Sequence, residues 1–279
     1  MIKANKIKKK YPEFELDLDL EIKDDTITAI LGTNGAGKTT FFKSVLGLIH
    51  IDEGSISIDG VPVDSLSPRD KENIGVVFPD SIVNAYLPIK DVRQILKASY
   101  TRFDAAMFDE LVDRFHLPKQ SKIKSFSTGE KAKFKLICAL THDANLLILD
   151  EPTSGLDVIV REELLDMLRV FMEKPGRSIV ISSHISSDLE HLCDEFYILH
   201  EGKIVLHETM DALDQYAILK IKDGQALDDA YALRKTKTPY GWAVLTNQKQ
   251  YYIDNFPQIV VEPASMDDVF TMVVQGETI

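Results

Sequence analysis

A short glycine-rich stretch between two apolar runs constrains the fold of this chain most. It follows the strand-like run 27–31 and precedes the helix-like run 41–48. A loop of this kind directs backbone N–H groups and the positive end of a helix at one point, which suits a chain of phosphates. Its spacing is that of a P-loop, so we predict a nucleotide-binding site in an α/β fold. The residues predicted to surround the phosphates are Gly32, Thr33, Asn34, Gly35, Ala36, Gly37, Lys38, Thr39 and Thr40.

Two side chains of this loop have the chemistry that phosphate binding requires. Lys38 would bring a mobile positive charge to the β- and γ-phosphates of a nucleotide. The hydroxyl of Thr39 would be a ligand of Mg²⁺, because this hard cation prefers oxygen. A chance match in a solvated loop is the alternative, and the strand before the loop and the helix after it argue against that alternative.

Charge and composition limit the classes of protein to which the chain can belong. Its 279 residues can bury a large core, and its formal net charge is −12. A negative protein repels the phosphate backbone, so we do not expect a general nucleic-acid binder. No apolar stretch approaches the roughly 18 residues needed to span a bilayer, and no signal-peptide core is present, so we expect a cytoplasmic protein.

The remaining hydrophobic pattern divides the chain into further parts. Apolar and acidic residues alternate over 14–22, which predicts a strand of an antiparallel sheet. Helical spacing over about 89–144 predicts a helical insertion, and the apolar run 146–149 predicts a buried strand of a parallel sheet. A small mixed region follows, with strands predicted over 218–221, 242–245, 251–254 and 259–262 and a helix over 266–274.

The predicted fold class is therefore α/β. A P-loop NTPase core with a mostly parallel sheet carries an antiparallel β subdomain and the helical insertion, placed at about 80–145. We expect this nucleotide-binding domain to cover residues 1–213 and a small accessory α+β domain to cover residues 214–279.

Two adjacent carboxylates at the end of a buried strand are the strongest catalytic candidates. Asp150 and Glu151 end the apolar run 146–149. Their mutual repulsion calls for a cation, so Asp150 would hold Mg²⁺ or its water. Glu151 projects differently and would activate a water for attack on a phosphate. His184 follows another buried run, and residue type alone leaves a satisfied structural histidine as the alternative.

Further motifs follow the P-loop in one order: residues 125–130, the pair Asp150-Glu151, residues 154–157 and His184. Together they resemble the nucleotide-binding subunit of ATP-binding-cassette (ABC) transporters over residues 1 to about 210. Residues 146–153 resemble the Walker B strand of that family, and residues 154–157 resemble its D-loop. The resemblance implies an ATPase with ATP and Mg²⁺ as cofactors, in which Glu151 and His184 are catalytic and His184 contacts the γ-phosphate.

Residues 126–130 resemble the family signature Leu-Ser-Gly-Gly-Gln. In this family the signature of one subunit closes on the nucleotide held by another, so the resemblance implies a homodimer or a pair with a related ATPase subunit. Thr128 replaces a glycine of the signature, and its β-branched side chain restricts the backbone. The residues implied to meet nucleotide in this way are Ser127, Thr128, Gly129, Glu130 and Asp157.

Two other positions near the site leave alternatives open. Tyr11 follows three lysines ahead of the P-loop strand, where its ring would stack on adenine or pack against the protein. Pro79 stands where the family usually has a glutamine that senses Mg²⁺ and links to the membrane subunit, and proline offers no side-chain ligand. Asp80 would take over the metal contact, or the altered loop would serve the membrane subunit.

The C-terminal residues indicate which group of ABC transporters the chain resembles. Residues 262–270 resemble the tail of ATPases that serve ABC-2-type exporters, and exporters of antimicrobial, bacteriocin or toxin-like peptides look nearest. This implies an ATP-hydrolysing motor at the inner face of the cell membrane, bound to a separate transmembrane permease. The alternative is a soluble ABC ATPase acting on nucleic acid or ribosomes, which the net charge of −12 disfavours. A simple P-loop kinase would explain neither the signature nor His184.

Overall fold

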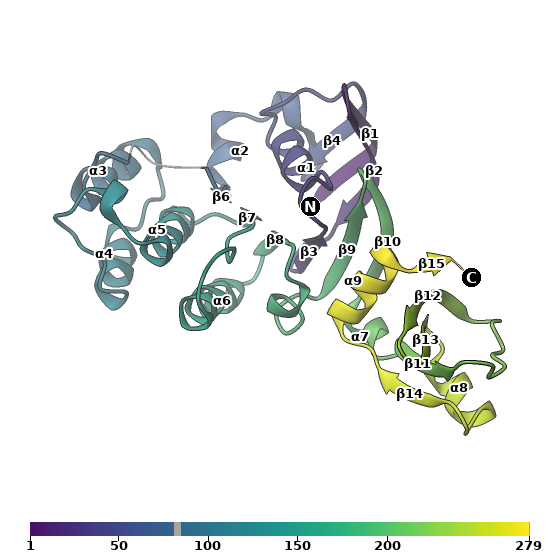
Figure 1. The fold of residues 1–279 in the computed structure, drawn as a ribbon. Coiled ribbons are helices and arrows are strands. Elements are labelled where there is room, and N and C mark those ends of the chain that lie inside the picture. The colour runs from purple at the N-terminus through teal and green to yellow at the C-terminus, as the bar shows by residue number, and fades with distance from the viewer. Residues whose placement is uncertain (81–84, 279) are drawn as a thin grey trace.

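The computed structural model describes residues 1–80 and 85–278 and contains two β-sheets with helices packed around them (Figure 1). The elements in chain order are β1 (Ile2–Tyr11), β2 (Phe14–Ile22), β3 (Ile27–Leu31), α1 (Lys38–Val45), β4 (Glu53–Ile58), β5 (Val61–Pro62), α2 (Pro68–Glu72), β6 (Ile74–Val77), α3 (Ile89–Ser99), α4 (Ala105–Arg114), α5 (Thr128–Leu140), β7 (Leu146–Asp150), α6 (Val158–Met172), β8 (Ser178–Ser183), the 3₁₀ turn η3 (Ser186–Asp188), β9 (Glu195–His200), β10 (Lys203–Thr209), α7 (Met210–Leu213), β11 (Ala217–Lys222), β12 (Ala232–Thr238), β13 (Gly241–Thr246), α8 (Lys249–Asn255), β14 (Val260–Pro263), α9 (Met266–Gln275) and β15 (Glu277–Thr278).

The first sheet joins the predicted parallel core to the predicted antiparallel part. Its strand order is β5-β4-β1-β2-β10-β9-β3-β8-β7-β6. The strands from β9 to β6 run parallel to their neighbours, whereas β1 pairs antiparallel with both β2 and β4. All residues of β3, β7 and β8 are buried, as expected for parallel strands covered on both faces. The α/β fold class is therefore confirmed.

The predicted helical insertion consists of α3, α4 and α5 beyond strand β6 (Figure 1). Aromatic rings hold it together, because Phe134 on α5 makes edge-on contacts with Phe108 and Phe126 at centroid distances of 6.2 and 6.0 Å. Such edge-to-face pairs add to the free energy gained by burying the rings. No helix in the described part of the chain is long and apolar enough to cross a membrane.

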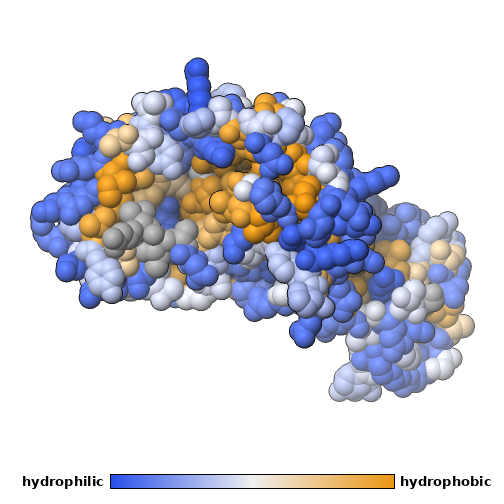
Figure 2. All heavy atoms as spheres, turned by 90° about the horizontal axis from the view of Figure 1, so that it is seen from above, coloured by the Kyte–Doolittle hydropathy of each residue, from blue (hydrophilic) through white to orange (hydrophobic). Residues whose placement is uncertain are grey.

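The second sheet is built entirely from the C-terminal part of the chain. Its five strands lie in the order β14-β11-β13-β12-β15, and all pair antiparallel. The predicted helix over 266–274 is confirmed as α9, which lies between this sheet and the first one (Figure 1). Figure 2 shows this part set apart at one side, while apolar residues gather in the middle of the larger body.

One predicted strand of this region is wrong. Residues 251–254 lie in helix α8 and not in a strand. The helix places Tyr252 fully inside a small core with Leu219 and Val244, and its hydroxyl donates to the carbonyl oxygen of Asp228 at 2.8 Å. A run this short fits both the helical and the strand periodicity, so packing against the sheet determined that these residues form a helix.

Candidate nucleotide-binding site

The P-loop lies between the buried strand β3 and helix α1, in the predicted context. Gly37 is the N-cap of α1 and has φ 113°, a conformation that favours glycine. A Cβ atom there would lie 2.8 Å from both Phe14 Cζ and Leu16 Cδ1. Glycine is therefore required at this position, and the N–H groups of the first turn of α1 remain available for an anion.

Lys38 is buried at the start of α1, with its charge directed back into the loop. Its Nζ donates to the carbonyl oxygens of Gly32 at 2.6 Å and Thr33 at 3.2 Å. It also lies 3.0 Å from Glu151 Oε1, which places a compensating negative charge beside a buried ammonium group. A phosphate oxygen would compete with these oxygens for the protons of Nζ.

Asp150 is fixed by two hydroxyl groups at the end of β7. Thr39 Oγ1 donates to Asp150 Oδ2, and Ser182 Oγ donates to Asp150 Oδ1, each at 2.6 Å. The side chain is only 1% exposed. Sequence analysis missed Ser182, although the register of β7 and β8 pairs it directly with Asp150. Two serines that end an apolar run were the signal that could have found it.

Glu151 lies between a lysine and a histidine. His184 Nδ1 is hydrogen-bonded to Glu151 Oε2 at 2.5 Å, and Lys38 Nζ stands near the other carboxylate oxygen. That second oxygen, Oε1, has no directed hydrogen bond among the described residues. Glu151 also has φ 51°, an uncommon conformation for a residue other than glycine. The strand end therefore presents a carboxylate whose Oε1 is buried against the Lys38 ammonium. If a phosphate drew Lys38 away, this oxygen would be free to take a proton from a water.

A cavity of about 420 Å³ brings the P-loop, the carboxylates and the start of α5 together, and we call it the nucleotide cavity. Residues that line it include Asn34, Val77, Phe78, Pro79, Thr128, Lys131, Ala132, Lys135, Asp150, Glu151, Pro152, Ser154, Leu156 and His184. The structure thus gathers the predicted catalytic pair Glu151 and His184 with predicted metal ligand Asp150 in one hollow.

The oxygen ligands present suit Mg²⁺. Thr39 and Asp150 supply two oxygen donors that already touch each other. In the described ranges 1–80 and 85–278, no group of three or more His, Cys, Asp or Glu side chains could hold a metal ion. Magnesium retains waters readily and is often shared between one or two protein oxygens and substrate phosphates, so this small donor set fits it.

The signature residues lie at an exposed helix start. Ser127 caps α5 by accepting from the N–H of Glu130 at 3.1 Å, and Glu130 Oε2 accepts from the N–H of Ser127 at 2.7 Å. A Cβ atom on Gly129 would lie 3.2 Å from the side chain of Val160 on α6. Thr128 lines the nucleotide cavity, whereas Ser127, Gly129 and Glu130 are not among the described residues that line it.

Asp157 and Tyr11 stand at two other edges of the site. Asp157 caps α6 by accepting from the N–H of Val160 at 3.0 Å. The Tyr11 ring is 44% exposed and lies 6.3 Å from the ring of Phe14, which itself touches the position of Gly37. Only the ring of Phe14 separates Tyr11 from the P-loop, and part of the Tyr11 ring is exposed. This position is compatible with stacking on adenine and with packing against the protein.

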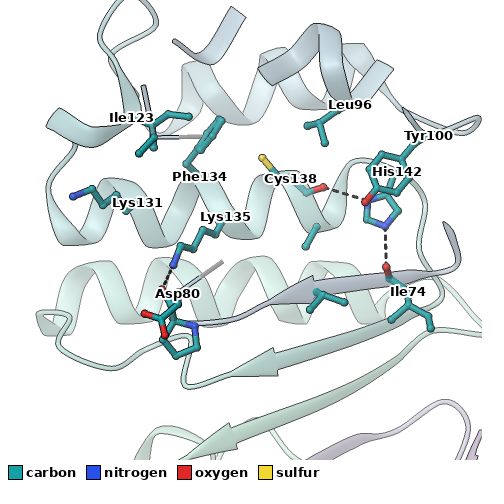
Figure 3. A pocket seen from close by; sticks show the side chains of 14 residues that line it. Ile74, Asp80, Leu96, Tyr100, Ile123, Lys131, Phe134, Lys135, Cys138 and His142 are labelled. Atoms are coloured by element: carbon teal, nitrogen blue, oxygen red, sulfur yellow. Dashed lines mark hydrogen bonds between the residues drawn. The ribbon is translucent and has the colours of Figure 1, made fainter. Parts of the chain in front are cut away.

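A second cavity, of about 600 Å³, adjoins the first, and we call it the apolar cavity (Figure 3). Its lining residues are Ile74, Val76, Pro79, Asp80, Ala85, Leu96, Tyr100, Ile123, Lys131, Phe134, Lys135, Cys138, Ala139 and His142. Asp80 lies here and is not among the described residues that line the nucleotide cavity. Among the described residues, Pro79 thus shares the nucleotide cavity with the predicted metal ligand Asp150, and the metal role of Asp80 stays a prediction.

Lys135 forms part of the wall between the two cavities. It projects from α5, and its Nζ donates to the carbonyl oxygens of Phe78, at 3.0 Å, and of Pro79. Burial lowers the pKa of Lys135, and the charge of nearby Asp80 opposes this shift. In the apolar cavity burial also lowers the pKa of His142 and raises the pKa of the Cys138 thiol to about 12.

Comparison with known proteins gives consistent matches. The family described as ABC transporter matches residues 16–154. The lantibiotic transport ATP-binding protein SrtF of Streptococcus pyogenes is 33% identical over 215 residues, which cover 76% of this chain and 92% of SrtF. A solved ATP-binding subunit of an ABC transporter is 26% identical with a TM-score of 0.68, covering 77% of this chain and 92% of its own. The bacterial cassette MJ0796, solved as a dimer, has the same fold with a TM-score of 0.67 at 22% identity, covering 75% of this chain and 99% of its own.

Proposed function

The chain belongs to the ABC transporter family as an ATP-hydrolysing subunit, and from this premise we propose that it drives export through a separate permease in the membrane. The observation that carries the proposal is the position of Glu151. This carboxylate stands at the end of β7 between Lys38 and His184, beside the P-loop. This arrangement supports Glu151 as a proton acceptor next to the groups that would hold the phosphates.

Each residue of the site then has a chemical task. Lys38 and the N–H groups of the P-loop would hold the β- and γ-phosphates, and Thr39 and Asp150 would hold Mg²⁺. Magnesium, when bound, would neutralise charge on the phosphate oxygens. Glu151 would take the proton of the attacking water, and His184 would contact the γ-phosphate and orient Glu151 through their hydrogen bond. Tyr11 would stack on the base.

A dimer would complete two such sites. Ser127 and Thr128 are exposed at the N-terminus of α5, where the helix favours an anion. Asp157 is equally exposed at the start of α6. These ends would meet the nucleotide held by a second copy or by a related ATPase subunit. The dimeric form in which the MJ0796 cassette was solved supports this arrangement.

The permease would dock at the apolar cavity. Its lining of Leu96, Ile123 and Phe134 would accept apolar side chains of a cytoplasmic segment of the partner. Pro79, Lys131 and Lys135 line this cavity and the nucleotide cavity as well, so a segment seated here would reach the ATP site through these three residues. The chain would then sit on the inner face of the membrane as a peripheral subunit.

The cargo class and the domain division belong to the same proposal. The similarity to SrtF supports a peptide cargo, and the resemblance of residues 262–270 to exporter ATPases supports export. The segment 1–213 would be the ATP-binding domain, with 80–145 as its helical subdomain, and 214–279 would be an accessory domain. The alternative role on nucleic acid or ribosomes receives no support from the family match.

Affinity purification of the tagged chain from detergent-solubilised membranes tests the proposal. We expect a helical membrane protein to co-purify and to raise the ATPase rate of the chain. A matched preparation of the Asp80→Ala variant should recover less of that protein. Recovery of ribosomes or nucleic acid in its place would contradict the transport function.

A further inference from the structure

We propose that the C-terminal helix α9 positions the loop that carries His184, with Asp267 as the positioning residue. The proposal rests on the proposed contact of His184 with the γ-phosphate. It assigns a task in ATP hydrolysis to the C-terminal region, which has no nucleotide motif of its own.

The direct link is a hydrogen bond two residues beyond His184. Ser186 is 1% exposed, and its hydroxyl donates to Asp267 Oδ1 at 2.5 Å. The bond joins η3, which follows β8, to the first turn of α9, which lies 81 residues further along the chain. A buried hydroxyl that loses its acceptor leaves an unsatisfied polar group, so the loop gains free energy from staying against α9.

A second link anchors the same segment a few residues later. The backbone N–H of Met266 donates to Glu190 Oε2 at 3.3 Å. Met266 and Leu189 are fully buried in one hydrophobic cluster, which also holds Val269 of α9. The loop after His184 is therefore held to α9 by the side chains of Ser186 and Glu190 and by the burial of Leu189.

The opposite side of the loop is tied to the turn that carries Glu151. Asp188 is buried and accepts from Thr153 Oγ1 at 3.0 Å and from Arg161 Nη1 at 2.7 Å. Thr153 stands two residues after Glu151. The segment 186–190 thus connects α9 to the turn that follows Glu151. A shift of α9 would therefore be passed to that turn through this segment.

His184 depends on this bridge for its own position. Its side chain is 34% exposed and hydrogen-bonds to Glu151, which it must orient. The backbone anchor two residues beyond it would therefore help to set where the imidazole lies.

The Asp267→Ala variant of the full-length chain tests the inference. We expect kcat for ATP hydrolysis to fall by roughly 3- to 10-fold. The ATP dissociation constant, measured by equilibrium binding, should stay unchanged, because the Asp267 side chain bonds to Ser186 and not to the P-loop. Asp267→Asn keeps an oxygen acceptor for Ser186 and should lie between Asp267→Ala and the unmodified chain. Asp211→Ala, which removes an acid from the first turn of α7, is the matched control and should leave kcat unchanged.

A double variant separates positioning from general destabilisation. If Asp267 acts through His184, His184→Ala combined with Asp267→Ala should be no slower than His184→Ala alone. Independent, multiplying losses, or an unchanged kcat in Asp267→Ala, would overturn the inference. A normal kcat in His184→Ala would instead overturn the proposed role of His184, so the two failures can be told apart.

Discussion

The two adjoining cavities share Pro79, Lys131 and Lys135 but are otherwise unlike. The nucleotide cavity holds carboxylates and a histidine at strand ends, and Lys38 stands against its Glu151. The apolar cavity is walled mainly by side chains of the helical insertion and of β6. The proposed chemistry and the proposed docking would thus occupy separate hollows with a common wall, and a change in one would reach the other only through that wall.

The physical basis of each cavity differs as well. Positions in the nucleotide cavity are fixed by the ends of β3, β7 and β8, whose backbones are locked in register. Positions in the apolar cavity depend on how the helical insertion packs on β6 through α5. Polar substitutions should therefore affect the isolated ATPase strongly in the first cavity and weakly in the second.

Glu151→Gln gives the largest expected effect. An amide cannot accept the proton of the attacking water, so we expect kcat to fall by about 100-fold or more while ATP binding remains. The variant should accumulate as an ATP-bound dimer, which size-exclusion chromatography with ATP can detect. A kcat within a few-fold of the unmodified chain would exclude Glu151 as the general base.

Lys38→Ala should act on binding itself. Loss of a charge-assisted contact to phosphate should weaken ATP binding by roughly 10- to 100-fold. Titration with a fluorescent ATP analogue measures this affinity. Lys43→Ala, a lysine in the last turn of the same helix, is the control and should bind normally. Equal affinity in both variants would show that Lys38 does not reach the phosphates.

Tyr11→Ala should have a smaller effect that does not depend on the γ-phosphate. A stacked ring contacts the base, so ATP and ADP should both lose about 1–2 kcal/mol of binding free energy. Tyr11→Phe retains the ring and should bind both nucleotides normally. Unchanged affinities in Tyr11→Ala would return this residue to a packing role.

Asp80→Ala should have the smallest effect on the isolated ATPase. Because Asp80 lines the apolar cavity, we expect normal hydrolysis and an unchanged magnesium requirement, with weaker binding of the permease. Titration of activity with Mg²⁺, with and without the membrane partner, checks both points. A raised magnesium requirement in the isolated chain would instead support Asp80 as a metal ligand and would remove the separation between the two cavities.

The sequence by itself determined the features that depend on local geometry. Glycines between a buried strand and a helix specify a P-loop, and an apolar run that ends in Asp150-Glu151 places two carboxylates at the edge of a parallel sheet. The helix over 266–274 was also predicted from the sequence, and in the structure Ser265 and Asp268 form a reciprocal capping box at its start. Each of these features is encoded within about ten consecutive residues.

Only the tertiary structure decided which distant residues meet. The pairing of Ser182 with Asp150, the place of Asp80 beside the apolar cavity and the bond between Ser186 and Asp267 all join segments far apart in the chain. Residues 251–254 became a helix because Tyr252 fills the core under the second sheet. No local periodicity carries this information, since contact between remote segments is selected by packing and by the need to satisfy buried polar groups.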